Sequence, residues 1–153
     1  MSAKSAKSAV LTDKAPAPLA GIYSQAIVAN GFVFVSGAVP TPLTRYSMDT
    51  TGKIIEGDVA AHTTPEDPAN RAPQHQCIKN LGAILEAAGT SLENVVKVNV
   101  FIADMADFAA MNEVYSQYWG EVKPVRTCVA VKTLPLNTDV EIECTAVLPQ
   151  AKL

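Results

Sequence analysis

The sequence predicts an α+β fold in which two helices pack on one face of a sheet, with the elements in the order ββαβαββ. Three observations lead to this prediction: an Asn-Gly pair joins two β-rich runs, two later segments carry apolar residues at helical spacing, and three more are rich in β-branched residues. The chain has 153 residues, 48% of them hydrophobic and 18% charged, which suits one domain with its own core. We expect a flexible tail over residues 1–14, a single domain over residues 15–149 and a short tail over residues 150–153.

The first two strands are predicted within residues 22–36, which read IYSQAIVANGFVFVS. Asn30-Gly31 tolerates the positive φ angles of a type I′ turn, so the two runs should form an antiparallel hairpin. The second run, from Phe32 to Val35, is apolar on both faces. That pattern is typical of a strand in the interior of a sheet, and we expect it to be well buried.

A long loop is expected next, over residues 41–73. The stretch from Pro40 to Pro73 holds five prolines and the turn signal Thr51-Gly52, with a short strand at residues 53–55. Loops of this length are commonly functional. This one could set the selectivity for a substrate or partner, and a passive surface excursion is an equal alternative.

The remaining elements follow the apolar periodicity. A helix over residues 74–88 is stopped by Gly89, and its apolar stripe comprises Ile78, Leu81, Leu85 and Ala88. The strand over residues 95–102 has one side formed by Val96, Val98, Val100 and Ile102. A second helix, capped by Asp104 or Asp107 and running to Trp119, has a stripe of Met105, Phe108, Asn112, Tyr115 and Trp119. Two further strands, over residues 125–133 and 140–147, are joined by a loop over residues 134–138.

Two helices can cover only one face of such a sheet. We expect the covered face to carry Val125, Thr127, Val129 and Val131 together with Val140, Ile142 and Cys144. The opposite face would then carry Arg126, Cys128, Ala130 and Val147 beside Glu141 and Glu143. This mixture is too apolar for free solvent and too charged for an ordinary core, so it predicts a homo-oligomer, a dimer or a trimer, whose sheet faces turn inward.

Charge and cysteine content exclude several classes of protein. A net charge of −3 and a pI near 5.3 provide no basic field for nucleic acid or for an acidic membrane surface. No apolar run is long enough to span a bilayer, and the start of the chain, MSAKSAKSAV, lacks the apolar segment of a secretory signal. Three cysteines without a C-x-x-C pair indicate a reduced compartment and no structural metal. We therefore expect a cytoplasmic protein, with the mitochondrion as the alternative.

Arg126, Cys128 and Glu141 form the candidate site. Period-2 alternation puts Arg126 and Cys128 on one face of a strand, and an antiparallel return could bring Glu141 near them. Because the guanidinium fork matches a carboxylate, the ligand suggested is a small carboxylic acid; the alternative is a structural Arg–Glu pair. Glu141 or Glu143 could act as a general base on water. We favour an inert or hydrogen-bonding Cys128 over a nucleophile, because no histidine is placed to activate it.

Several segments resemble the RidA family, also called the YjgF family, over residues 15–149. They are GIYSQA from Gly21, VSG from Val35, NL through EAAG between Asn80 and Gly89, DF through Asn112 from Asp107, PVRTCVAV from Pro124 and VEIE from Val140. The resemblance implies a chorismate-mutase-like fold assembled as a homotrimer with inward-facing sheets and a cleft between each pair of subunits. It also implies hydrolytic deamination of reactive 2-imino acids and enamines, such as 2-iminopropanoate and 2-iminobutanoate, to 2-oxo acids and ammonia without a cofactor.

The resemblance further implies roles for individual residues. Arg126 would bind the substrate carboxylate, Glu141 would position or activate water, and Cys128 would complete the catalytic group. The pocket would be lined by Tyr23, Ser36, Gly37, Asn112 and Cys128. The sequence departs from the family pattern at Ile22, at Ala38 and in two insertions near residues 43–50 and 63–72. A pathway-dedicated enzyme for a larger imine and a non-catalytic trimer that binds small carboxylates therefore remain alternatives.

Overall fold

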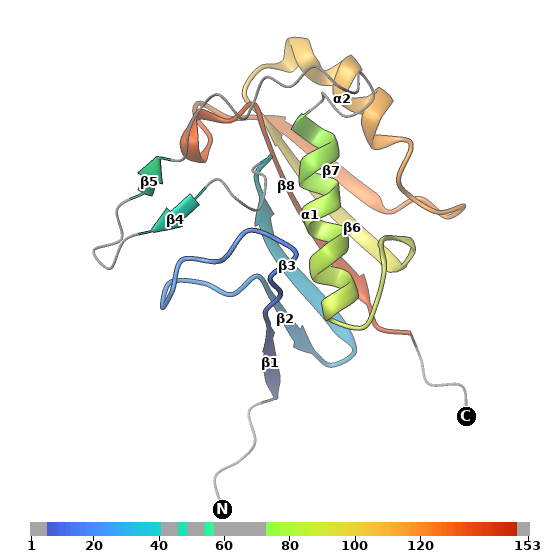
Figure 1. Ribbon diagram of the computed structural model, residues 1–153. Coiled ribbons are helices and arrows are strands. Elements are labelled where there is room, and N and C mark those ends of the chain that lie inside the picture. Colours follow the sequence, from blue (N-terminus) through green and yellow to red (C-terminus); the bar gives the residue numbers. More distant parts are fainter. Residues whose placement is uncertain (1–5, 41–45, 49–53, 57–72, 150–153) are drawn as a thin grey trace, which may run out of the picture.

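The computed structural model describes residues 6–40, 46–48, 54–56 and 73–149. Their main unit is a mixed six-stranded sheet in the order β1-β2-β3-β8-β6-β7, with helix α1 lying across one face (Figure 1). The strands are β1 (Lys7–Val10), β2 (Ala26–Ala29), β3 (Phe32–Ala38), β6 (Val95–Ile102), β7 (Val125–Ala130) and β8 (Val140–Val147). The helices are α1 (Pro73–Ala87) and α2 (Phe108–Tyr115). The predicted α+β class and the order ββαβαββ are confirmed for β2 to β8 of this sheet, and β1 is an additional strand.

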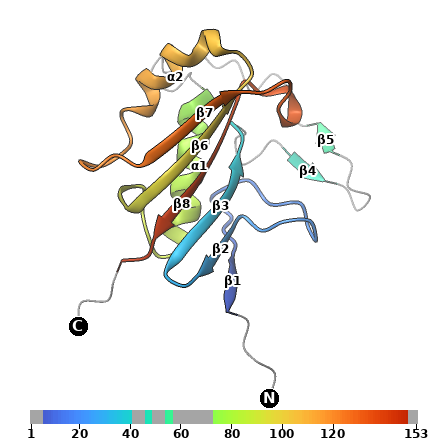
Figure 2. The ribbon, with the colours of Figure 1, turned by 180° about the vertical axis from the view of Figure 1, so that it is seen from behind.

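The core lies between the sheet and the helices. In β8, Val140, Ile142, Cys144 and Ala146 are buried and alternate with half-buried residues, as predicted. Ile78, Leu81 and Leu85 of α1 are fully buried in the same cluster, and α2 adds Met111 and Tyr115 to it. Burial of each such aliphatic side chain contributes roughly 1.5–3 kcal/mol. The two helices therefore cover the same face, and the view from behind shows the other face of the sheet without a helix over it (Figure 2).

The first hairpin forms as the sequence predicts. Asn30 and Gly31 have φ angles of 49° and 80°, the positive values that a type I′ turn requires. The strand β3 lies in the interior of the sheet, between β2 and β8, which confirms its predicted place. The prediction that it is well buried is only half right, because Phe32 and Phe34 are 42% and 49% exposed on the uncovered face.

The predicted tail and the predicted long loop both contain strands. Residues 7–10 were expected to belong to a flexible tail, but they form β1, which pairs antiparallel with β2 from Lys7 opposite Ala29 to Val10 opposite Ala26. The backbone ladder stabilises this strand, although only Val10 of its four residues is buried. Within the predicted loop, β4 (Tyr46–Met48) pairs with β5 (Ile54–Glu56), which overlaps the expected strand at 53–55. The rest of residues 41–72, with most of both insertions, lies outside the described residues.

The predicted partner and orientation of β7 are wrong. This strand ends at Ala130 rather than at residue 133, and it pairs in parallel with β6, not antiparallel with β8. Arg126 is opposite Val98 and Cys128 is opposite Val100, so both lie on the helix-covered face. Val125 and Val129 face the open side instead, where they are 67% and 41% exposed. The alternation of residues between the two sides of β7 was predicted correctly. The pairing of β7 with β6 decides which of these sides faces the helices.

Smaller corrections concern β6 and α2. A register shift between Val95 and Lys97 turns Val96 outward, where it is 40% exposed. Met105 is exposed, and fully buried Met111 occupies the core in its place. The helix α2 ends at Tyr115, before the predicted end at Trp119. The amide of Ser116 still bonds to the carbonyl of Asn112, four residues back, but the amide of Gln117 bonds to the carbonyl of Val114, three residues back, as in a 3₁₀ turn.

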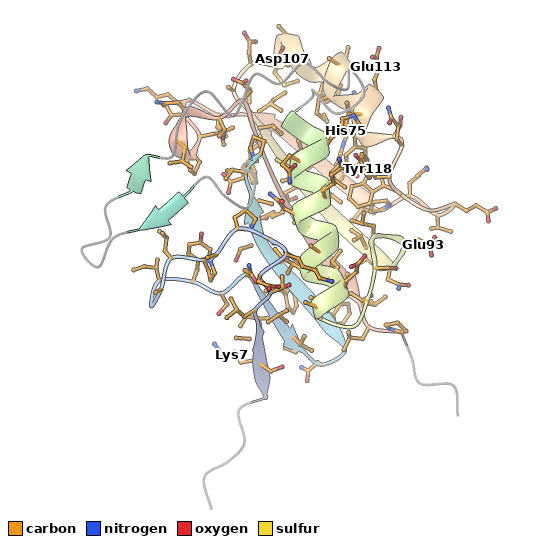
Figure 3. The ribbon with its side chains drawn as sticks, viewed as in Figure 1. Lys7, His75, Glu93, Asp107, Glu113 and Tyr118 are labelled. Carbon is orange, nitrogen blue, oxygen red and sulfur yellow. The ribbon has the colours of Figure 1, made fainter. Side chains whose placement is uncertain are left out.

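Side-chain hydrogen bonds hold the segments on either side of α2. The carboxylate of Asp104 accepts the amide of Ala106 at 2.9 Å and so caps the short 3₁₀ turn before α2. Beyond the helix, the Tyr118 hydroxyl hydrogen-bonds the His75 ring of α1 (Figure 3). The second contact ties the segment that follows α2 to α1.

Candidate active site

Arg126 is held by three side chains on one face of α2. Its Nη1 donates a hydrogen bond to Asn112 Oδ1 at 2.5 Å. The Cζ atom lies 4.8 Å from the centre of the Tyr115 ring and 5.5 Å from that of Phe108. Among the residues that the structure describes, no carboxylate forms an ion pair with Arg126. The alternative of a structural Arg–Glu pair is therefore not found among the described residues, and the guanidinium keeps further N–H donors for a ligand.

Cys128 follows Arg126 on the same face of β7 and packs half-buried against the core. Burial raises the pKa of its thiol, and the nearby positive charge of Arg126 only partly opposes this shift. A thiol with a raised pKa is protonated at neutral pH, whereas a nucleophile must be a thiolate. The chemistry of Cys128 thus suits a wall of the site or a weak hydrogen-bond donor.

A second group of predicted residues gathers at the far end of β3. Tyr23, Ser36 and Gly37 line a hollow of about 60 Å³ together with Gln25 and Asn80. The Ser36 hydroxyl donates to the carbonyl of Ser24 at 2.7 Å, and the Tyr23 side chain is 45% exposed. This hollow presents polar groups beside apolar walls, and Arg126 is not part of it.

Glu141 belongs to this second group. A Cβ built on Gly37 would lie 1.9 Å from Glu141 Oε1, which places the carboxylate directly over the glycine. Burial raises the pKa of Glu141, and the negative charge of Glu143 raises it further. Glu143 on the same strand accepts a hydrogen bond from Asn99 at 2.7 Å. Of the two glutamates proposed as a base, Glu141 is therefore the one without a hydrogen-bonding partner among the described side chains.

The expectation that Arg126, Cys128 and Glu141 share a sheet face is wrong. Glu141 is opposite Phe101 on the uncovered face, whereas Arg126 is opposite Val98 on the covered face. Glu141 lies on β8, and β6 separates β8 from β7, so the strands that carry Glu141 and Arg126 are about 10 Å apart at about 4.8 Å per strand. The chain therefore carries two half-sites: Arg126, Asn112 and Cys128 form the cationic half-site, and Tyr23, Ser36, Gly37 and Glu141 form the carboxylate half-site.

Sequence reasoning missed the surroundings of Arg126. Phe108 and Tyr115 were assigned to an apolar stripe, and their contact with the guanidinium was not foreseen. The signal was the spacing of Phe108, Asn112 and Tyr115, which puts two rings and an amide on one helix face. No group of three or more His, Cys, Asp or Glu side chains in the described part of the chain could hold a metal ion, and no helix there could span a membrane.

These features define a class: a small α+β domain with a guanidinium prepared for an acid and a carboxylate in a separate half-site. The chain belongs to the family described as endoribonuclease L-PSP, the YjgF or RidA family, whose model matches residues 12–148. The resemblance drawn from the sequence is confirmed.

Curated relatives cover most of the chain. A RutC family protein of Pyrococcus horikoshii is 44% identical over 140 residues, which is 92% of this chain and 97% of the relative. The mitochondrial protein mmf1 of Schizosaccharomyces pombe is 46% identical over 83% of this chain and 68% of its own length. The chloroplastic Reactive Intermediate Deaminase A of Arabidopsis thaliana is 41% identical over 93% of this chain and 66% of its own length.

Solved structures have the same fold. Yeast Mmf1 superposes with a TM-score of 0.72 at 38% identity, covering 94% of this chain and 99% of that one. TdcF of Escherichia coli, solved with bound serine, superposes with a TM-score of 0.69 at 32% identity, covering 93% of this chain and 99% of that one.

Proposed function

We propose that this protein hydrolyses reactive 2-imino acids and their enamines, of the 2-iminopropanoate and 2-iminobutanoate type, to 2-oxo acids and ammonia without a cofactor. The observation that carries the proposal is Arg126, whose guanidinium is oriented by Asn112 and has no carboxylate partner among the described residues. A relative named Reactive Intermediate Deaminase A supports the same chemistry. The bound serine of TdcF is consistent with a small ligand that bears a carboxylate.

We further propose that the working site forms between subunits of a homotrimer. The two half-sites lie apart within one chain. Neither half-site alone can therefore hold a substrate between the guanidinium and the carboxylate. The uncovered face carries Phe32 and Phe34 on β3 and Val125 and Val129 on β7, all of them substantially exposed. Two different apolar patches favour a head-to-tail contact. Such a contact closes into a ring when the rotation between neighbours permits it, and we propose a closed ring of three subunits.

In this ring, the cationic half-site of one subunit faces the carboxylate half-site of its neighbour. Arg126 binds the carboxylate of the imino acid and fixes its C=N carbon near Glu141. A water molecule attacks that carbon, Glu141 accepts the proton that the water loses, and the carbon becomes tetrahedral. Glu141 returns this proton to the nitrogen, and the hydroxyl proton of the tetrahedral adduct then follows it. The C=O bond forms as the C–N bond breaks, which leaves the 2-oxo acid and ammonia. The raised pKa of Glu141 makes its carboxylate a stronger base for this step.

Three alternatives lead to different results. The name of the family model suggests RNA cleavage, but a net charge of −3 provides little attraction for a polyanion. A pathway-dedicated enzyme would act on a larger imine, and a regulatory trimer would bind a small carboxylate without turnover. We place the protein in the cytoplasm, with the mitochondrion as the alternative because mmf1 is named mitochondrial.

The test generates 2-iminopropanoate with an amino-acid oxidase and follows its loss with the wild type, Arg126→Ala and Glu141→Gln. We expect the wild type to accelerate the loss and Arg126→Ala to cost about 2–5 kcal/mol of transition-state stabilisation. Arg126→Lys should recover only part of this, because an ammonium lacks the planar fork. Glu143→Gln is the matched control for Glu141→Gln, since it lies on the same strand and face but is bonded to Asn99.

Equal rates for the wild type and for both Arg126→Ala and Glu141→Gln would refute the catalytic assignment. A wild type that binds 2-oxobutanoate through Arg126 without turnover would support the regulatory trimer. Slow turnover of 2-iminopropanoate with fast turnover of a larger imino acid would support the pathway-dedicated enzyme.

A further inference from the structure

We propose that Tyr115, assisted by Phe108, is a positioning residue: its ring holds the Arg126 guanidinium so that the remaining N–H groups point at the substrate carboxylate. This inference rests on the proposed function and names the side chains that make Arg126 an effective anchor. It assigns the effect to the face of the Tyr115 ring and not to its hydroxyl.

The first support is geometric. Phe108, Asn112 and Tyr115 are spaced four and three residues apart along α2, so their side chains emerge on one face of the helix. The two ring centres are 5.5 Å and 4.8 Å from Arg126 Cζ, both within the distance of about 6 Å over which a cation and an aromatic ring attract. The closer ring belongs to Tyr115, which is 9% exposed, whereas Phe108 is only half-buried.

The second support is the hydrogen-bond inventory of Arg126. A guanidinium has five N–H donors, and the one hydrogen bond found for it among the described residues is from Nη1 to Asn112. A hydrogen-bond acceptor would occupy an N–H group of the guanidinium, whereas an aromatic ring contacts the guanidinium and leaves its N–H groups unoccupied. The rings therefore restrict its motion and leave the donors available for the bidentate bond to a carboxylate.

The third support concerns the Tyr115 hydroxyl. It is buried and has no hydrogen-bond partner among the described residues. Burial raises the pKa of this hydroxyl to about 12, so it stays protonated at neutral pH and cannot act as a base. The Tyr115 ring also packs against Trp119, whose ring centre is 4.9 Å away. A tyrosine with an unused hydroxyl and a packed ring beside a cation fits a role for the ring itself.

The test measures the Kd of 2-oxobutanoate, the 2-oxo acid product, by calorimetry, and KM and kcat with 2-iminobutanoate. Tyr115→Phe keeps the ring and should leave the Kd within about twofold. Tyr115→Leu removes the π face, and the Kd and KM should rise between about 2-fold and 30-fold, the range that cation–π attraction supports. Phe108→Leu, at a less buried position, should give a smaller rise in the same direction.

Two comparisons separate positioning from general packing. Val114→Ala truncates a buried side chain of the same helix that has no aromatic contact with Arg126, so it should lower the melting temperature without changing the Kd. In an Arg126→Ala background, Tyr115→Leu should have no further effect on the Kd, because the group that it positions is gone.

The inference is overturned if Tyr115→Phe is as harmful as Tyr115→Leu, if Val114→Ala raises the Kd equally, or if the effect of Tyr115→Leu persists without Arg126. Should Tyr115→Leu fail to fold, Phe108→Leu decides, and an unchanged Kd there counts against the inference. If Arg126→Ala itself leaves the Kd unchanged, the proposed function fails. If Arg126→Ala weakens binding and Tyr115→Leu does not, only this inference fails.

Discussion

Replacing Gly37 with alanine should displace the proposed base without unfolding the protein. The added Cβ would meet Glu141 Oε1 at 1.9 Å and Cδ at 2.8 Å, whereas ordinary contacts begin at 3.4 Å. The carboxylate must therefore move by roughly 1.5 Å. Gly37 does not have a positive φ angle, so alanine can adopt its backbone conformation. Because the clash involves the free end of a flexible side chain, we expect a loss of about 1 kcal/mol in the free energy of unfolding, at the low end for overpacking.

The expected effect on catalysis is larger. Misplacement of a reacting group by about 1 Å costs on the order of 100-fold in rate, so kcat/KM for 2-iminobutanoate should fall by about two orders of magnitude. Gly82→Ala is the matched control. Gly82 lies within α1, and its added Cβ would meet the Leu92 side chain at 3.5 Å, an ordinary contact distance. In the Gly37→Ala background, Glu141→Gln should cost little more. Wild-type kcat/KM for Gly37→Ala, or fully additive losses in the double variant, would refute the role of this contact.

Three further predictions follow from burial and charge. Leu85→Ala, at a fully buried position of α1, should lower the free energy of unfolding by about 2–5 kcal/mol in urea, whereas exposed Glu86→Ala should change it by less than about 0.5 kcal/mol; equal losses would contradict the described core. The raised pKa of Glu141 means that the native state holds this proton more tightly than the unfolded state, so its stabilising contribution is complete at acid pH and is lost as pH rises through the raised pKa. Glu141→Gln should consequently gain melting temperature relative to the wild type as the pH rises above the ordinary glutamate pKa of about 4.5, and a difference that does not change with pH would argue against the shift. Because burial raises the pKa of the Cys128 thiol, iodoacetamide should modify it slowly at neutral pH, and Cys128→Ala should keep kcat within about tenfold of the wild type; complete inactivation would restore the nucleophile hypothesis.

The sequence pattern correctly predicted the strands and the turn whose bounds depend only on the residues within and beside them. The bounds of β6 and β8 agree with the predicted ones, because apolar side chains recur along each strand and turn residues flank it. The Asn30-Gly31 turn was likewise predictable, since few other residue pairs accept two positive φ angles. The strand β1 was missed because backbone pairing, which leaves no apolar signature, stabilises it.

The arrangement of the site was harder to predict because it depends on strand neighbours. Alternation correctly put Arg126 and Cys128 on one side of β7, but the parallel pairing with β6 decides that this side is the helix-covered one. The same pairing separates Arg126 from Glu141, which sequence order had suggested as a near neighbour. Exposed Val125 and Phe34 were predicted to be buried, and their exposure in a single chain is what an inward-facing oligomer would remove.

Mixing inactive subunits tests the shared site most directly. Arg126→Ala and Glu141→Gln chains, each inactive alone, would be co-expressed in equal amounts and assayed for imine hydrolysis. If each site takes its guanidinium from one subunit and its carboxylate from the next, three quarters of random trimers are hybrids with one complete site of three, and activity returns to about a quarter of the wild type. Activity no greater than that of the separate variants would show that the two groups do not act across a subunit boundary.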